Sequence, residues 1–404
     1  MKNVYVDNNA TTAVAPEVVE AMMPYLTTAF HNPSSMYERS RGPSDAIVAA
    51  RATVASMLGG VADPELIFTS CGTESNNAAL RGAARANPGR KHIITTAVEH
   101  PAVLEVCKAM ARDGYEVDFL PVDDQGRIDV PAYVRALRPG STLIVSIMHA
   151  NNETGVVFPV ADLARIAKET DPAILFHTDA TQTAGKLLLD LTAEYQHVDL
   201  MTFSGHKLHA PKGVGVLFQR KGSRVAPYLI GGHQERGLRA GTENVAGIVA
   251  LGKACELAVA AYDDEARVQA LRDRLERQLL EAIPYTHVNG ADAERLPNTL
   301  NVAFHFVEGE SILFELDRLG ICASSGSACT SGSLEPSHVL MAMKIPFTAA
   351  HGSIRISLSR YNTQADVDYV AQELPGIIAR LRRISPYWDQ AKNEPRADGP
   401  ADNH

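Results

Sequence analysis

Two stretches of the chain combine small polar residues with one reactive side chain each. Cys329 lies in SSGSACTSGS, residues 324–333, where no neighbour in sequence is large enough to pack around it. A structural cysteine usually behaves as a small buried hydrophobe, whereas a reactive one needs exposure and room to move. The composition around Cys329 therefore predicts a nucleophilic thiol.

The second stretch is TFSGHKLHAPKGVG, in which Lys207 directly follows an apolar run. An isolated lysine in such a place is usually a solvated loop charge. Lysine also forms Schiff bases with carbonyl cofactors, and pyridoxal phosphate (PLP) needs such a lysine, a carboxylate for its ring nitrogen and groups that hold its phosphate. Because candidates for each are present, the surroundings of Lys207 predict PLP chemistry.

Asp179 ends the apolar run ILFHTDA and suits the ring nitrogen, although capping of the next helix is the alternative. Gly72 and Thr73 open a helical segment whose backbone N–H groups and hydroxyl suit a phosphate, and here too a simple cap is the alternative. His100 precedes Pro101 at a strand-to-helix turn, where an imidazole can stack on a ring and move protons. A lone histidine is more often structural, but this combination favours function.

The elements that must position these residues alternate between strand and helix patterns from about residue 64 to 219. Segments with helical spacing, such as ESNNAALRGAARA and VADLARIAKET, separate apolar runs such as KHIITTAV and STLIVSIMHA. This alternation predicts an α/β fold with a mainly parallel sheet. Ligands bind beyond the carboxyl ends of such strands, and five polar clusters follow successive runs, so we expect them to converge on one site.

The remainder of the chain predicts a second unit. A helical stretch from about Thr242 to Ile283 leads into a smaller α+β pattern. We expect a large cofactor-binding domain of residues 15–255 and a small domain of residues 1–14 and 256–387 that carries Cys329. Residues 388–404 are polar and rich in Pro, Gly and Asp, which predicts a disordered tail.

Composition narrows the class of protein. The 404 residues are 45% hydrophobic with a net charge of −9, which argues against a broad nucleic-acid or anionic-membrane surface. No apolar run approaches the roughly 18 residues of a membrane span, and no signal core opens the chain, so a cytoplasmic location is expected. The cysteines lack paired spacing, so no stable metal site is expected; they are Cys71, Cys107, Cys255, Cys322 and Cys329.

Several motifs together carry a family resemblance. They run in order from residue 6 to about 363: VDNNATT, CGTESNN, VEHPAV, HANNETG, HTDATQ, TFSGHKLHAPKGVG, ERGLRAGTEN, SSGSACTSGSLEPSHVL and GSIRISLSRYNT. In these motifs the chain resembles the NifS/IscS-type cysteine desulfurases, class-V PLP enzymes with the aspartate aminotransferase fold. The resemblance implies PLP-dependent transferase fold type I, with a sheet of the seven-stranded type in the large domain and a smaller α+β domain.

The resemblance also implies individual roles. Lys207 would be the Schiff-base lysine, with Asp179 on the ring nitrogen, Gln182 on the ring hydroxyl and His100 over the ring as acid and base. Phosphate contacts are implied for Gly72, Thr73, Ser204, His206 and, from the second subunit of a homodimer, Thr242. The substrate carboxylate would be held by Arg355, whose fork suits it, and by Asn151, which also counts among the cofactor contacts.

The reaction that the resemblance implies converts L-cysteine to L-alanine. The Cys329 thiolate would attack the substrate sulfur, become a persulfide and pass sulfur to an iron–sulfur scaffold protein of the NifU/IscU kind. An exposed thiolate such as Cys329 is also able to ligate a cluster transiently. The stretch SLEPSHVLMAMKIPFTAAHGS resembles NifS, which serves nitrogenase metalloclusters, more than the housekeeping IscS.

Three residues depart from the family pattern: Thr181 where a valine is expected, and His233 and Leu238 where a small and a basic residue are expected. They bear on fine geometry and rate.

Other readings stay open. A housekeeping desulfurase, a selenocysteine lyase, an aminotransferase or a kynureninase relative would share the cofactor site, and those outside the desulfurases need no cysteine on a Ser/Gly loop. A non-enzymatic sulfur carrier is disfavoured by the intact PLP residues.

Overall fold

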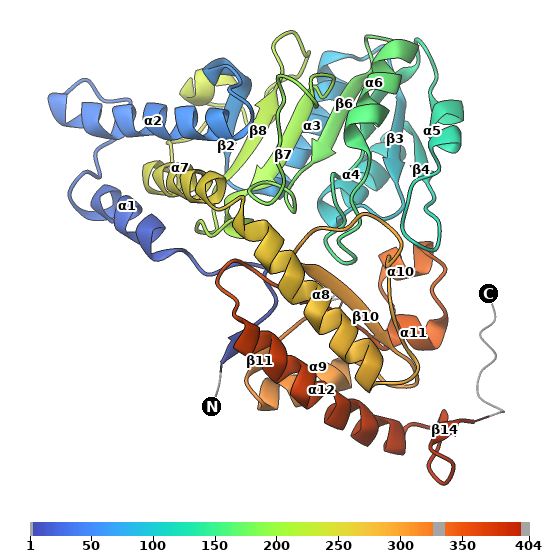
Figure 1. Cartoon of the computed structure of the whole chain (residues 1–404). Helices are drawn as coiled ribbons and strands as arrows, with labels where there is room; N and C mark the ends of the chain where they lie inside the picture. The colour runs from blue at the N-terminus through green and yellow to red at the C-terminus, as the bar shows by residue number, and fades with distance from the viewer. Residues whose placement is uncertain (1–2, 326–335, 397–404) are drawn as a thin grey trace.

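A seven-stranded sheet lies at the centre of the larger part of the molecule (Figure 1). The computed structural model describes residues 3–325 and 336–396. All neighbouring strands are parallel except where β8 pairs with β2 and β7. The predicted mainly parallel α/β fold is therefore confirmed. The order across the sheet is β2 (Leu66–Thr69), β8 (Gly215–Gln219), β7 (Leu200–Ser204), β6 (Leu175–Asp179), β5 (Thr142–Ser146), β3 (His92–Thr96) and β4 (Glu116–Leu120).

Helices cover both faces of this sheet, because successive strand residues point to opposite sides. Ile93 and Leu200 pack into one apolar cluster with α3 (Gly72–Ala86) and α4 (Pro101–Arg112). Their neighbours Ile94 and Met201 pack into the other cluster, with residues of α6 (Val160–Thr170) and α7 (Val245–Ala260). The elements α1 (Pro16–Thr27), α2 (Arg41–Met57) and α5 (Val130–Ala136) complete this part of the fold.

A third apolar cluster forms around a three-stranded antiparallel sheet, ordered β12 (Ser353–Ser357), β10 (Thr299–Phe304) and β9 (Thr286–Val288). Its helices are α8 (Asp264–Ala282), α9 (Gly309–Arg318) and α12 (Gln364–Ile384). The chain start joins this cluster, because β1 (Val4–Tyr5) pairs in parallel with β11 (Ile321–Cys322). By contrast, α10 (His338–Ala342) buries Val339 and Leu340 in the large-sheet cluster that contains Ile94 and Met201. The next helix is α11 (Phe347–His351). The domain boundaries stay a prediction.

The helical stretch expected from Thr242 to Ile283 is two helices. α7 and α8 are separated by residues 261–263 and bent by 76° at this break. The acidic run there explains the difference: Asp264 and Glu265 occupy the first turn of α8, where the helix dipole favours negative charge. Within the described residues, no single helix is long and apolar enough to cross a membrane; α7 and α8 pass that test only as this bent pair, by length and composition.

Disorder was the wrong prediction for residues 388–396. Trp388 is 2% exposed, and its ring lies against those of Tyr285 and Phe306. Trp388 itself lies in the short strand β13 (Trp388–Asp389), which pairs with β14 (Glu394–Pro395). One large aromatic side chain thus anchors a stretch whose average composition is polar. Residues 397–404 lie outside the described part.

Two ion pairs fix the segment that precedes α7. Arg51 of α2 and Glu235 meet at 2.7 Å with side chains 9% and 4% exposed, and Glu235 also accepts a hydrogen bond from the Phe68 backbone. Arg239 binds both carboxylate oxygens of Glu74, in the first turn of α3. Because α3 begins at the cavity described below, these pairs hold the 233–244 segment next to it.

Replacement of Arg51 by methionine tests the first pair. The change leaves Glu235 buried without its counter-charge, which costs about 3 kcal/mol in comparable cases. We expect urea denaturation followed by circular dichroism to show a loss of this order for Arg51→Met. The exposed Arg165→Met on α6 is the control and should change stability by less than about 1 kcal/mol. Equal stability of the two variants would contradict the assignment.

Candidate active site

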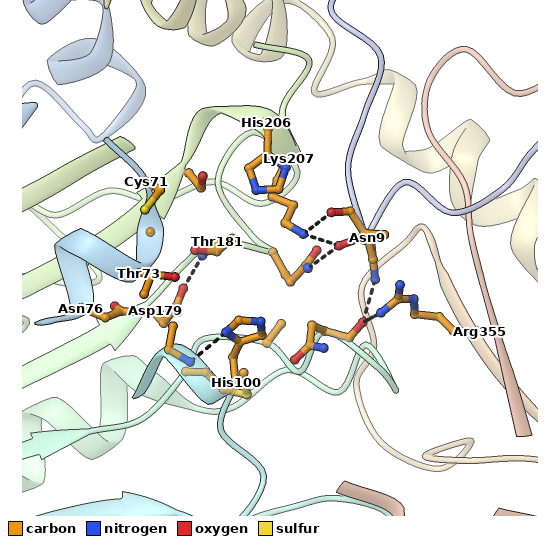
Figure 2. Close-up of a pocket in the computed structure, with 18 residues that line it drawn as sticks. Asn9, Cys71, Thr73, Asn76, His100, Asp179, Thr181, His206, Lys207 and Arg355 are labelled. Carbon is orange, nitrogen blue, oxygen red and sulfur yellow. Dashed lines mark hydrogen bonds between the residues drawn. The ribbon is translucent and has the colours of Figure 1, made fainter. Parts of the chain in front are cut away.

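A cavity of about 370 Å³ lies at the carboxyl ends of the strands of the large sheet, and Arg355 of the small sheet also lines it (Figure 2). It is lined by strand ends, by the starts of α3 and α4, by the N-terminal loop and by Arg355 of β12. The expected convergence of polar clusters therefore occurs. Most predicted site residues line this cavity: Gly72, Thr73, His100, Asp179, Gln182, Ser204, His206, Lys207 and Arg355.

The Lys207 amine is half-buried in the cavity, in a 3-10 turn (Gly205–Lys207) directly after β7. Nζ donates hydrogen bonds to the backbone oxygens of Asn9 at 2.6 Å and Ala10 at 2.7 Å, as Figure 2 shows. Gln182 donates to the same Asn9 oxygen at 3.1 Å. The N-terminal loop thus holds the amine at the cavity, and Lys207 must leave these carbonyls before it reacts.

Asp179 ends β6 and is fixed from two sides. Its Oδ2 accepts from Asn76 Nδ2 at 2.7 Å, and its Oδ1 accepts from the Thr181 backbone N–H at 2.9 Å. The Asn76 amide oxygen in turn accepts from the Thr202 hydroxyl. The contact with Thr181 is the turn expected from the capping alternative, and the carboxylate nevertheless lines the cavity. Asp179 therefore caps a turn and presents a carboxylate to a ligand.

The start of α3 makes a close-fitting cradle. Cys71 caps the helix, with Sγ accepting from the Glu74 backbone N–H at 3.4 Å. A Cβ placed on Gly72 would lie 3.2 Å from Thr181 Oγ1 and 3.5 Å from the Ser204 side chain. The first N–H groups of a helix lack intrahelical partners and attract anions. Gly72, Thr73 and Ser204 together therefore form a donor set that suits a phosphate.

Two histidines of the cavity are held neutral. Burial lowers the pKa of His100, and Nδ1 of its ring accepts from the Ala102 backbone N–H at 3.1 Å. A neutral ring with Nδ1 as acceptor carries its proton on Nε2. Burial, and next the charge of Lys207, lower the pKa of His206 to about 4. His206 contacts the Thr11 hydroxyl through Nδ1 at 3.1 Å.

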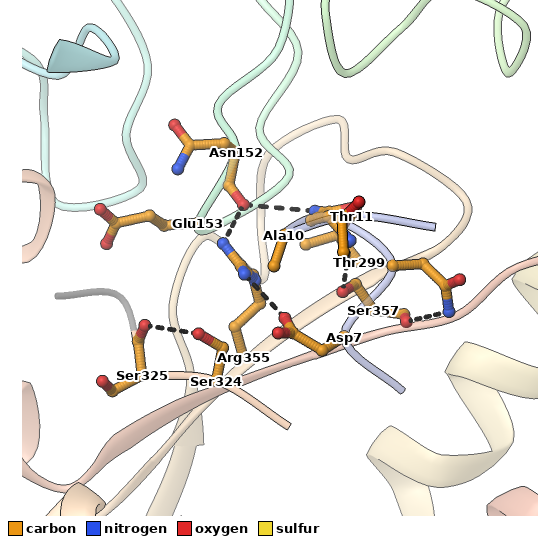
Figure 3. A network of polar contacts seen from close by, with 12 residues as sticks. Asp7, Ala10, Thr11, Asn152, Glu153, Thr299, Ser324, Ser325, Arg355 and Ser357 are labelled. Atoms are coloured by element: carbon orange, nitrogen blue, oxygen red, sulfur yellow. Dashed lines mark hydrogen bonds and ion pairs between the residues drawn. The ribbon is translucent and has the colours of Figure 1, made fainter. Parts of the chain in front are cut away.

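Arg355 joins three separate chain segments, as Figure 3 shows. Nη2 pairs with Asp7 Oδ1 at 2.8 Å, and Nη1 donates to the Asn152 backbone oxygen at 3.0 Å. Its side chain is 6% exposed, and Nε has no hydrogen-bond partner among the described residues. Burial raises the pKa of Asp7, and the Arg355 charge opposes that rise. This guanidinium is in place to receive an anion.

Asn151 is not among the residues that line this cavity. Its side chain is buried and already satisfied, since Nδ2 donates to the Val98 backbone oxygen and Oδ1 accepts from the backbone N–H groups of residues 153 and 154. Asn151 therefore shapes the turn, and the next residue, Asn152, lines the cavity. The contact of Asn151 with substrate and cofactor stays a prediction. Thr242 is exposed and lies outside this cavity, so its role in a second subunit stays a prediction. Cys329 falls outside the described residues.

Several residues of the site were missed in the sequence: Asp7, Asn9, Asn76 and Asn152. Asn76 carried a usable signal, because it lies four residues after Gly72 in a helical pattern and so shares its face. Asn152 also carried a signal, because it belongs to one of the polar clusters that follow the strands. Asp7 and Asn9 reach the site through the N-terminal loop, for which spacing gives no signal. Among the departures, Thr181 lines the cavity, His233 is exposed, and Leu238 packs against an apolar cluster.

Comparison with known proteins agrees with this geometry. Residues 4–370 match the model of the aminotransferase class-V family. The chain belongs to that family. It is 54% identical over 400 residues to cysteine desulfurase 2 of Trichormus variabilis, covering 98% of this chain and 99% of that one. It is 53% identical over 389 residues to the cysteine desulfurase NifS of Azotobacter vinelandii, covering 96% of each.

A solved NifS-like protein superposes on the structure with a TM-score of 0.87 at 39% identity, covering 94% of this chain and 100% of that one. Class-V enzymes of this group use PLP, and this chain is a PLP-dependent enzyme of the cysteine desulfurase kind. Its own residues fit that cofactor: Asp179 suits the ring nitrogen, the Gly72 cradle suits the phosphate, and the buried Gln182 Oε1 has no partner among the described residues.

The role of Asn76 gives a prediction. Asn76→Ala removes the hydrogen bond to the Asp179 carboxylate, and a bond to a charged group contributes about 1.5 to 3 kcal/mol. We therefore expect PLP affinity to fall about 10-fold or more, measured by titration of the cofactor-free protein with PLP. Asn77→Ala is the matched control, because that side chain bonds only its own helix backbone. Unchanged affinity in Asn76→Ala would contradict the role.

Proposed function

We propose that the protein takes sulfur from L-cysteine, releases L-alanine and holds the sulfur as a persulfide on Cys329. The observation that carries this proposal is the pairing of Ser324 with Arg355. Their backbones exchange hydrogen bonds of 2.6 and 3.2 Å in an antiparallel bridge. Because Arg355 lines the cavity, the segment that carries Cys329 starts at the rim of the cofactor site.

The sulfur-transfer step balances without an external oxidant. The Cys329 thiolate attacks the substrate sulfur, an S–S bond forms, and the bond between that sulfur and the substrate β-carbon breaks. The electron pair stays with the carbon, which gains protons and leaves as part of L-alanine. The carbon is reduced, and the two sulfur atoms reach the persulfide level.

Side chains of this protein bind the cofactor and move protons in the other steps of the proposed reaction. PLP, when bound, supplies an electron sink for the substrate carbons. Asp179 keeps a negative charge beside the place where a protonated ring nitrogen fits, and Lys207 supplies the amine that holds the cofactor covalently. His100 is neutral with its proton on Nε2, so it donates a hydrogen bond from Nε2. To accept a proton at Nε2 it must first carry its own proton on Nδ1, which releases the Ala102 backbone N–H.

Arg355 binds the substrate carboxylate in this proposal. Its guanidinium is already oriented by Asp7 and Asn152, so little side-chain freedom is lost on binding. A carboxylate arriving beside Nε would find a buried donor without a partner among the described residues. The same residue thus orients the substrate and anchors the start of the Cys329 segment.

The cellular role is also a proposal. The similarity to the NifS protein of Azotobacter vinelandii supports sulfur supply for nitrogenase metalloclusters, with a scaffold protein of the NifU/IscU kind as acceptor. A cytoplasmic homodimer in which Thr242 reaches the partner's phosphate site completes the proposal. The exposed position of Thr242 is compatible with this arrangement.

Substitution of Cys329 tests the proposed reaction directly. We expect Cys329→Ala to lower L-alanine production from L-cysteine by at least about 100-fold with an unchanged PLP content, since the nucleophile is lost. Cys322→Ala, in β11, is the control and should retain activity. Mass spectrometry of the wild type should find one reductant-labile sulfur on the Cys329 peptide. Undiminished L-alanine formation by Cys329→Ala would favour a lyase instead.

The pH dependence follows from His100. Its pKa is lowered from the ordinary 6.5, so the ring gains its second proton only below pH 6.5. We therefore expect the acid limb of kcat/KM that depends on His100 to lie below pH 6.5 and to disappear in His100→Gln. A limb above that pH belongs to another group, such as the Cys329 thiol, whose ordinary pKa is about 8.5. A limb above pH 6.5 that His100→Gln abolishes would contradict this assignment.

A further inference from the structure

Both ends of the segment that carries Cys329 are tied to one turn at the rim of the cavity. Upstream, Ser324 pairs with Arg355, whose guanidinium donates to the Asn152 backbone oxygen. Downstream, the Ser337 hydroxyl donates to Oε2 of Glu153, the next residue of the same turn. Figure 3 shows Asn152, Glu153, Arg355 and Ser324 together. Residues 151–155 therefore connect the two anchors.

Glu153 is an unusual residue to find at this place. It is 3% exposed, and a buried carboxyl costs free energy unless it is well paired. Burial raises its pKa to about 7, although the Ser337 hydrogen bond and the Arg355 charge oppose the rise. Glu153 does not line the cavity, so it does not touch a ligand there. Its role must be exercised through the residues it contacts.

The Ser337 hydroxyl acts both as a hydrogen-bond donor and as an acceptor. Oγ donates to Glu153 and accepts from the backbone N–H groups of Val339 at 3.1 Å and Leu340 at 3.4 Å, which caps α10. The buried Val339 and Leu340 then fix α10 in the large-sheet cluster. His338 Nε2 also donates to the Glu99 backbone oxygen at 3.0 Å, next to His100. The start of α10 is thereby held against the same side of the site as His100.

We propose that Glu153 is a positioning residue for sulfur transfer, which fixes the downstream end of the Cys329 segment through Ser337. The inference rests on the proposed role of Cys329 as sulfur acceptor. The upstream end is set by Arg355, which also receives the substrate in this proposal, so the two contacts together fix where the segment leaves and rejoins the described structure. Without the Glu153 contact, substrate binds as before, but the thiol meets the substrate sulfur less often.

The test separates sulfur transfer from binding. Glu153→Ala and Ser337→Ala each remove the contact, whereas Glu153→Gln and Ser337→Thr retain an acceptor and a hydroxyl. The rate of persulfide formation on Cys329 is measured in a single turnover by mass spectrometry, alongside KM for L-cysteine and PLP content. Glu105→Ala, an exposed glutamate of α4, is the matched control.

We expect both alanine variants to lower the persulfide-forming rate about 10-fold, the effect of losing one hydrogen bond, with KM and PLP content within about twofold of the wild type. Glu153→Gln and Ser337→Thr should stay within about twofold in rate. The double variant Glu153→Ala/Ser337→Ala should be no slower than either single one, because both lose the same contact.

Two results would overturn the inference. One is an unchanged persulfide-forming rate in both alanine variants. The other is a parallel fall of rate, PLP content and melting temperature in all four variants, which would show that Glu153 only supports the fold. If Glu153→Ala does not fold, Ser337→Ala with Ser337→Thr still decides the question. Absence of the persulfide in the wild-type protein would instead reject the proposed function itself.

Discussion

The ion pair between Arg355 and Asp7 is the interaction on which the site depends most. It joins β12 to the N-terminal loop, and the Asn152 oxygen brings the large sheet to the same guanidinium. Further along the same loop, the backbone carbonyls of Asn9 and Ala10 accept hydrogen bonds from the Lys207 amine. Because Arg355 is buried and the Asp7 side chain is only 18% exposed, loss of either partner would leave a charge poorly compensated, so the two residues are kept together.

The polar groups of the cavity are organised before any ligand arrives. Asp179 is fixed by Asn76 and Thr181, and His100 by the backbone of α4. A preorganised site avoids the cost of ordering side chains at the moment of reaction. Burial keeps both His100 and His206 neutral, so the positive charge near the substrate comes from Lys207 and Arg355.

In the proposed reaction, the turn at residues 151–155 connects substrate binding to sulfur transfer. Asn151 shapes it from within, Asn152 holds Arg355 through its carbonyl, and Glu153 holds Ser337. A substitution within this turn therefore affects geometry at several places, even where the residue touches no ligand. Consecutive residues with similar side chains therefore have different contacts: Asn151 bonds within the turn, and Asn152 lines the cavity.

The sequence by itself determined the parallel α/β sheet and most of the cavity residues, because strand periodicity and polar clusters after strands are local signals. It indicated Lys207 and Asp179 for the same reason. The tertiary structure decided what local signals cannot carry: the break between α7 and α8, the burial of Trp388, and the contacts of Asp7, Asn9 and Glu153 with residues far away in the sequence. Such contacts arise only when distant segments pack together, and burial then decides which polar groups pair and which titrate.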